Sequence, residues 1–230
     1  MKKIGLIAGM SWESSAIYYQ LINTLVNKQL GGTQSADILM NSVNYAPFLE
    51  LAAQGNWKEI GFLTADIAKK LQQGGAECIA ICCNTVHHIA DVVVQSIDVP
   101  FIHIADPCGV AISNSGLKKV ALLGTRTTTE QGFFKDRLRE RFGVEVTIPD
   151  SEDRIYLDDI IKNELCRGQF RNETRQRVVS IIKSLEMRGA EGVILGCTEL
   201  PIIIKPEQCD IQVFDTTLCH SEALVEFALN

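Results

Sequence analysis

The chain has 230 residues, of which 46% are hydrophobic and 22% charged, and its formal net charge is −6. These proportions are ordinary for a globular protein, and an acidic chain without a basic face excludes nucleic acid as an expected partner. No apolar run reaches the roughly 18 residues that a membrane-spanning helix needs. Residues 1–4 run directly into a strand-like segment and do not resemble a signal peptide. We therefore expect a cytoplasmic protein with no membrane partner.

Short apolar runs alternate with longer amphipathic segments along the whole chain. The apolar runs predict strands at residues 4–8, 38–42, 78–83, 101–103, 120–124, 144–148, 192–196 and 212–214. The amphipathic segments predict helices at residues 13–28, 57–73, 86–96, 108–114, 130–142, 155–166, 173–188 and 221–229. Strands buried on both faces have continuous apolar runs, and strands that alternate with helices favour a parallel sheet with helical crossovers. The pattern predicts an α/β fold.

One segment of the chain is repeated. Residues 75–85 align without a gap on residues 189–199, so that Cys83 corresponds to Cys197, and residues 2–9 match residues 118–125 at nearly the same spacing. An internal duplication implies two similar domains. We expect two pseudo-symmetric, doubly wound domains with the active site in the cleft between them. The first would comprise residues 1–106 and 210–230, including the last strand and helix, and the second residues 107–209.

Four loops with small polar side chains follow predicted strands, at residues 9–11, 83–85, 125–128 and 197–199. Ligands of parallel α/β sheets bind outside the carboxyl ends of the strands, and the free amides at a helix start suit a carboxylate. Thr127 and Glu130 have the spacing of a capping box, which predicts a helix start at Thr127. The alternative interpretation is that these loops only cap helices. As binding loops, they make Met10, Ser11 and Thr127 candidate substrate contacts.

Two of the eight cysteines, Cys83 and Cys197, stand where a predicted strand ends, which in an α/β fold is the place just before a helix start. The amides at a helix start favour a thiolate. Two thiols on opposite faces of one small substrate suit a proton exchange at carbon, in which one removes a proton and the other donates one. The alternative is that both are incidental buried cysteines. Cys78 and Cys82 fall inside an apolar strand and are expected to be core residues.

No cofactor motif is present. The chain contains neither Gly-x-Gly-x-x-Gly nor Gly-x-x-x-x-Gly-Lys-Ser/Thr, the fingerprints of dinucleotide and nucleotide phosphate binding. Cys82 and Cys83 with His87 and His88 suggest a metal site, but adjacent strand residues point to opposite faces and suit one tetrahedral ion poorly. We expect neither a metal nor a cofactor.

Four motifs, in this order, resemble those of the aspartate/glutamate racemase family: residues 9–11 (Gly-Met-Ser), 83–87 (Cys-Asn-Thr-Val-His), 123–125 (Leu-Gly-Thr) and 196–199 (Gly-Cys-Thr-Glu). The resemblance covers the length of the chain. It implies two α/β domains, an amino-acid substrate, a cofactor-independent two-base mechanism and a homodimer. Carried over by position, Cys83 and Cys197 are the two bases. The residues that the resemblance implies as the cradle for the α-carboxylate and amino group are Asn84, Thr85, Thr125, Thr128 and Thr198.

The resemblance leaves the substrate side chain open. Aspartate-specific members place an arginine after the second strand, and residues 43–47 here, Val-Asn-Tyr-Ala-Pro, contain none. The leading hypothesis is a racemase acting on aspartate, glutamate or a broader set of amino acids. Alternatives on the same fold are a hydantoin racemase or an isomerase of the maleate type, in which one cysteine is a nucleophile. An alternative from another class is a non-catalytic small-molecule binding protein or thiol redox sensor.

Overall fold

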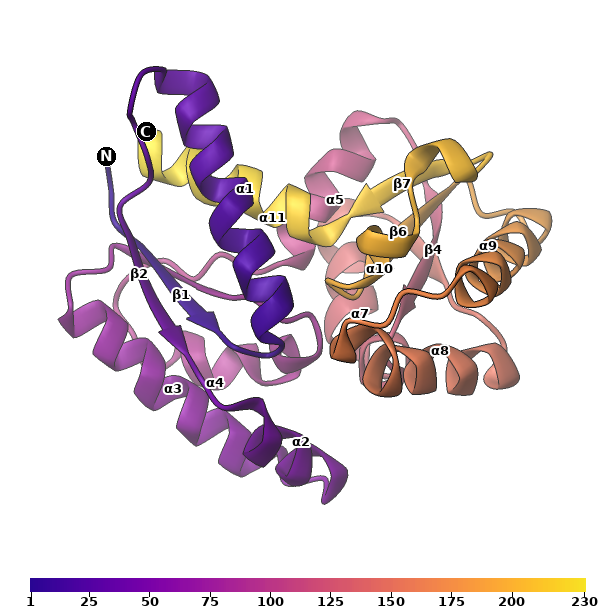
Figure 1. Cartoon of the computed structure of the whole chain (residues 1–230), viewed down its shortest axis with the longest axis horizontal. Coiled ribbons are helices and arrows are strands. Elements are labelled where there is room, and N and C mark those ends of the chain that lie inside the picture. The colour runs from indigo at the N-terminus through magenta and orange to yellow at the C-terminus, as the bar shows by residue number, and fades with distance from the viewer. The chain divides into compact units, whose positions relative to one another are not determined.

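The computed structural model describes residues 1–230, which divide into two compact units. Unit 1 comprises Met1–Ile104 and His220–Asn230, and unit 2 comprises Ala105–Cys219. Each unit contains one parallel β-sheet flanked by helices (Figure 1). The predicted α/β class is therefore confirmed. None of the helices combines the length and the apolar character that a membrane span requires.

Unit 1 has a three-stranded parallel sheet in the order β2-β1-β3. Its strands are β1 (Ile4–Ala8), β2 (Ile38–Ser42) and β3 (Cys78–Ile81). Its helices are α1 (Trp12–Leu30), α2 (Tyr45–Ala53), α3 (Trp57–Gln73), the 3-10 helix η1 (Thr85–Ile89), α4 (Ala90–Val94) and the larger part of α11 (Thr216–Leu229).

Both faces of the unit 1 sheet are buried. Ile4, Leu6 and Ala8 pack with residues of α1 and α11, whereas Ile7 packs with residues of α3. Successive side chains of a strand point to opposite faces, so β1 contributes to two separate hydrophobic clusters. This burial on two faces explains the unbroken apolar sequence of β1.

Unit 2 has a four-stranded parallel sheet in the order β5-β4-β6-β7. Its strands are β4 (Lys119–Gly124), β5 (Glu145–Thr147), β6 (Gly192–Gly196) and β7 (Gln212–Asp215). Its helices are α5 (Ala105–Asn114), α6 (Arg126–Glu130), α7 (Gly132–Phe142), α8 (Ser151–Asn163), η2 (Leu165–Arg167), α9 (Asn172–Met187), α10 (Leu200–Ile203) and η3 (Pro206–Gln208).

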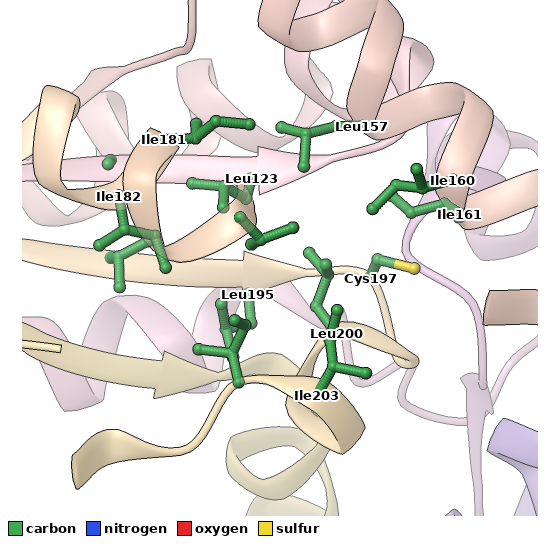
Figure 2. Close-up of a cluster of buried hydrophobic side chains, with 14 of the residues drawn as sticks. Leu123, Leu157, Ile160, Ile161, Ile181, Ile182, Leu195, Cys197, Leu200 and Ile203 are labelled. Carbon is green, nitrogen blue, oxygen red and sulfur yellow. The ribbon is translucent and has the colours of Figure 1, made fainter. Parts of the chain in front are cut away.

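One large hydrophobic cluster fills the space between the unit 2 sheet and helices α8, α9 and α10. Leu123 of β4 and Leu195 of β6 lie among the leucines and isoleucines of these helices (Figure 2). Cys197, which follows β6, belongs to the same cluster. The position of Cys197 is therefore set by the buried strand that it follows.

The repeated segment folds in the same way in both units. Its glycines, Gly75 and Gly189, have φ angles of +93° and +90°, a region that glycine enters without the penalty of a Cβ atom. Two residues later, Glu77 and Glu191 accept backbone amide hydrogen bonds from the segments that begin β1 and β4. There is one such bond of 2.8 Å in unit 1 and there are two of 2.9 Å in unit 2. The repeat therefore builds the same turn into the strand that carries each cysteine.

The last strand does not lie where the sequence places it. We expected residues 212–214 to rejoin the first domain, but β7 pairs with β6 over four residues of the second sheet. The chain returns to unit 1 only within α11, at His220. The prediction was wrong because a short apolar sequence does not specify the sheet edge with which its strand will pair.

Two further predictions need correction. Residues 101–103 do not form a strand, since only Phe101 bridges to the sheet, at Ile79. The helix predicted at 86–96 is divided into η1 and α4, and α2 was missed because residues 45–53 have a short, almost uniformly apolar sequence with a proline. In position, Phe101 is the unit 1 counterpart of β7, because each pairs with the strand that precedes a cysteine.

Candidate functional site

The two candidate cysteines occupy matched positions at the carboxyl edges of the two sheets. Cys83 follows β3 by two residues, and Cys197 follows β6 directly. Each is only 6% exposed. In parallel α/β sheets this edge is where ligands bind. Both thiols therefore stand at the place in their own unit where a bound ligand is expected.

The Cys197 thiol is hydrogen-bonded to a buried carboxylate. Its Sγ donates to Oε2 of Glu199 at 3.0 Å, and the hydroxyl of Thr198 donates to the same oxygen at 2.9 Å. Burial raises the pKa of Cys197 well above its ordinary value, and the negative charge of Glu199 raises it further. Desolvation and a like charge both disfavour a thiolate. Cys197 therefore rests as a thiol whose proton points at a carboxylate.

The backbone carbonyl of Cys83 is hydrogen-bonded to a histidine. The carbonyl oxygen of Cys83 lies 2.8 Å from Nδ1 of His87, and the amide of Ile104 donates to Nε2 of the same ring at 3.2 Å. An amide N–H can only donate, so Nε2 carries no proton and Nδ1 carries the hydrogen. His87 is therefore a neutral imidazole that donates to the Cys83 carbonyl.

The loop after β1 is shaped by serines at the start of α1. Ser11 caps the helix and accepts from the amide of Ser14 at 3.3 Å. The hydroxyl of Ser15 donates to the Ser11 carbonyl at 2.6 Å and accepts from the amide of Gly9 at 2.8 Å. Met10, between them, is buried. The sequence analysis selected Met10 and Ser11 but missed Ser14 and Ser15, since Ser14 gives the cap only its backbone amide and no sequence motif marks either serine.

The loop after β4 begins a helix two residues earlier than predicted. Thr125 is the N-cap of α6 and accepts from the amide of Thr128 at 3.3 Å, and the two hydroxyls are 3.1 Å apart. The predicted cap Thr127 lies inside α6. The predicted capping-box residue Glu130 instead pairs with Arg126. Thr125 takes the cap because it is the first residue beyond β4, where the chain must already turn.

The structure brings the candidate residues together in two sets, one in each unit. In unit 1, Met10 and Ser11 follow β1, while Asn84 and Thr85 follow its neighbour β3 together with Cys83. In unit 2, the candidates that follow the paired strands β4 and β6 are Thr125, Thr127, Thr128, Cys197 and Thr198. Because Gly124 pairs with Gly196, Thr125 and Cys197 leave the sheet side by side.

Positive charge is scarce in these loops. Arg126 is the one cationic residue of the four, and its guanidinium is bound to Glu130 through two contacts of 3.1 and 3.2 Å. After β2, where the resemblance implied an arginine, Asn44 caps α2 by accepting from the amide of Ala46 at 3.3 Å. No group of three or more histidine, cysteine or acidic side chains is arranged to hold a metal ion.

The chain is similar to known proteins along most of its length. A family model described as Asp/Glu/Hydantoin racemase matches residues 7–224. The chain is 24% identical over 226 residues to a broad-specificity amino-acid racemase from Bacillus subtilis, and the match covers 96% of both chains.

Two solved structures match along their whole length. A candidate Asp/Glu racemase from Yersinia pestis is 43% identical with a TM-score of 0.93, and an aspartate racemase homologue from Pyrococcus horikoshii is 35% identical with a TM-score of 0.86. Each match covers 100% of both chains. The likeness therefore extends over both units and includes the strands that carry the two cysteines.

Proposed function

The chain belongs to the Asp/Glu/hydantoin racemase family and is an isomerase, and on that premise we propose that it is a cofactor-independent amino-acid racemase with Cys83 and Cys197 as its two acid–base groups. The observation that carries the proposal is the duplicated cysteine at the carboxyl edge of both sheets. Two matched thiols suit a reaction that must treat two mirror-image substrates alike.

In the proposed reaction one thiolate takes the α-hydrogen as a proton, which leaves the bonding electron pair on the substrate. The other thiol then gives its proton to the opposite face of the α-carbon. No electron is gained or lost overall, and the two cysteines exchange roles in the reverse direction. Each thiol must come within hydrogen-bond reach of the same α-carbon.

The Cys197–Glu199 contact supports a role for the carboxylate in this exchange. As the acid, Cys197 already holds its proton. As the base, it must first lose that proton, and Glu199 Oε2, 3.0 Å away, is placed to accept it. Glu199 is almost completely buried, so the proton need not pass through bulk water. We assign Glu199 the role of proton acceptor for Cys197.

The small polar residues of the four loops are proposed to hold the α-carboxylate and the amino group. Helix starts offer free amide donors and a partial positive charge, and threonine hydroxyls can both donate and accept. The proposed contacts are Met10, Ser11, Asn84, Thr85, Thr125, Thr127, Thr128 and Thr198.

The scarcity of cations supports a substrate with a neutral side chain. A second carboxylate that is removed from water without a partner costs several kcal/mol, and the only cation of these loops, Arg126, is already paired with Glu130. The similarity to the broad-specificity racemase of Bacillus subtilis points the same way. We propose broad specificity for neutral amino acids over aspartate and glutamate.

The test is a chiral assay in deuterated water with a panel of pure L- and D-amino acids, with chelator and without added pyridoxal phosphate. We expect racemisation of neutral amino acids with deuterium incorporated at the α-carbon, and slower reaction of aspartate and glutamate. Hydantoins and maleate belong in the same panel as substrates of the alternative reactions. Turnover of those compounds alone, or activity that requires an added metal or pyridoxal phosphate, would contradict the proposal.

The homodimer that the resemblance implies stays a prediction. Sedimentation of the purified protein over a range of concentrations would test it, and a single species with the mass of one chain would overturn it.

A further inference from the structure

We infer that His87 is a positioning residue for Cys83: it orients the peptide that carries this thiol, and it does so through its Nδ1–H. The inference rests on the proposed function in one respect, since it takes Cys83 to be one of the two acid–base groups. The His87 side chain is only 1% exposed.

The hydrogen-bond ladder of the unit 1 sheet ends just before Cys83. The last ladder bond beyond β3 runs from the amide of Cys82 to the carbonyl of Ile7, at 2.9 Å. Beyond Cys83, the amide of His87 donates to the carbonyl of Asn84 at 3.0 Å, at the start of η1. The carbonyl of Cys83 lies between these two systems and accepts from the imidazole. A side chain therefore takes over where the backbone ladder ends.

The imidazole of His87 is itself anchored at its other ring nitrogen. Nε2 of His87 accepts from the amide of Ile104, so a rotation of the ring would break both hydrogen bonds. The segment to which it is anchored is also fixed. The amide of Ile102 donates to the carbonyl of Ile79 at 2.9 Å, and the carbonyl of Ile102 accepts from Nε2 of His220 at 2.8 Å.

The carbonyl of the other cysteine has a different kind of donor. The carbonyl of Cys197 accepts from the backbone amide of Leu200, at 3.1 Å. Its loop therefore closes by an ordinary main-chain turn and needs no side chain. In the repeat, Pro201 stands where His87 would be, and a proline ring offers no donor. The positioning role is therefore specific to Cys83, and its loss should affect one face of the substrate only.

Two substitutions separate this role from a merely structural one. In His87→Asn, the amide nitrogen is bonded to Cγ as Nδ1 is, so the donor to Cys83 is kept and the acceptor for Ile104 is lost. In His87→Gln, the amide oxygen stands at the distance of Nε2, so the acceptor is kept and the donor to Cys83 is lost. Each variant loses one buried hydrogen bond, and we expect similar falls in melting temperature.

The readout is exchange of the α-hydrogen with deuterated water, starting from each pure enantiomer. The enantiomer whose exchange is lost in Cys83→Ser defines the Cys83 face. We expect His87→Gln to lower exchange at that face by roughly 10- to 100-fold, because small displacements of a reacting group carry penalties of this size. His87→Asn should restore most of it, and exchange at the Cys197 face should stay within about threefold of wild type in both variants.

A second readout does not depend on racemisation. The alkylation rates of Cys83 and Cys197 by iodoacetamide, resolved by peptide mass spectrometry, should show a selective change at Cys83 in His87→Gln and not in His87→Asn. His88→Gln is the matched control, since this neighbouring ring packs edge-on against Trp57 with 4.8 Å between ring centroids. If wild-type protein racemises nothing, the proposed function fails while the alkylation result still tests His87. Equal effects of Asn and Gln, or equal loss at both faces, would overturn the inference.

Discussion

The loops that carry Cys83 and Cys197 begin from the same frame and end with different chemistry. Before the cysteine, both units use a glycine at positive φ and a glutamate that accepts amide bonds from the first strand. After the cysteine, the two units differ. In unit 2 the carboxylate of Glu199 accepts a hydrogen bond from the Cys197 thiol, and in unit 1 the imidazole of His87 donates one to the backbone carbonyl of Cys83. The two copies of the repeat therefore share the glycine and glutamate that precede the strand, and they differ in the hydrogen bonds made by the cysteine that follows it.

This difference places a carboxylate beside the thiol of Cys197. Burial and Glu199 hold the proton on Cys197, whereas at Cys83 the aligned position after Asn84 is Thr85, which has no charge. A racemase needs one thiol and one thiolate at the start of each turnover. Cys197 starts one direction of the reaction as the thiol, and in the other direction it must first pass its proton to Glu199.

The largest effect is expected when either cysteine is removed. A serine keeps the shape, but its hydroxyl is a far weaker acid than a thiol, so Cys83→Ser and Cys197→Ser should each lower racemisation by roughly 10²- to 10⁴-fold. Exchange of the α-hydrogen should survive for one enantiomer in each variant, and for opposite enantiomers in the two. If both variants exchange the same enantiomer, or either racemises at the wild-type rate, a single nucleophilic cysteine becomes the better account.

Replacing Glu199 should change the acidity of Cys197. Glu199→Gln removes the negative charge that raises the pKa of Cys197, so that pKa falls and the alkylation of Cys197 begins at lower pH. Racemisation should fall by roughly 10- to 100-fold, because the proton acceptor for Cys197 is lost.

The matched control for Glu199→Gln is Glu191→Gln in the same unit, a glutamate that bonds only backbone amides. It should leave both the alkylation profile and the rate unchanged. An unchanged Cys197 profile in Glu199→Gln would show that burial alone keeps this thiol protonated.

The free energy of unfolding should fall at alkaline pH because both units contain buried thiols. Burial raises the pKa of Cys78 to about 12 and raises those of Cys82, Cys108 and Cys197 as well. In the unfolded chain these thiols ionise near pH 9, so the folded state binds more protons above that pH. The free energy of unfolding is therefore undiminished below about pH 9 and falls as the pH rises toward 12, by up to about 1.4 kcal/mol per pH unit for each thiol.

Urea midpoints measured between pH 7 and 11 test this dependence. Cys82→Ala, in unit 1, and Cys197→Ser, in unit 2, should each make the decline shallower, whatever they do to stability at pH 7. A slope identical to that of wild type in either variant would mean that its thiol ionises equally in the folded and unfolded chains.

The smallest effect tests the part of the comparison that the two units share. Gly75→Ala and Gly189→Ala place a Cβ atom at positive φ, where little surrounds it: nothing lies within 4 Å at Gly75, and only Lys119 Nζ at 3.6 Å at Gly189. Each should therefore cost about 1–2 kcal/mol of stability from backbone strain alone. Denaturant unfolding should show equal losses, and a difference between them above about 1 kcal/mol would mean that the two turns are not equivalent.

The sequence alone determined the α/β class, the duplication and the position of each cysteine after a buried strand. These follow from signals within a few residues: continuous apolar runs, glycines at turns and small polar residues where strands end. The predicted capping box at Thr127 and Glu130 was wrong because the position of the cap depends on where β4 ends. Thr125 leaves β4 first, and the cap forms there.

Only the tertiary structure decided where β7 pairs, that residues 101–103 make a single bridge, and what each cysteine touches. The pairing of β7 with β6 is a choice between sheet edges that its four residues do not encode. The partner of His87 at Ile104 lies 17 residues along the chain, and its ring becomes a neutral donor to Cys83 only because that amide occupies the other nitrogen. Sequence patterns record which residues lie near one another along the chain, whereas hydrogen-bond partners are set by packing between segments far apart in it.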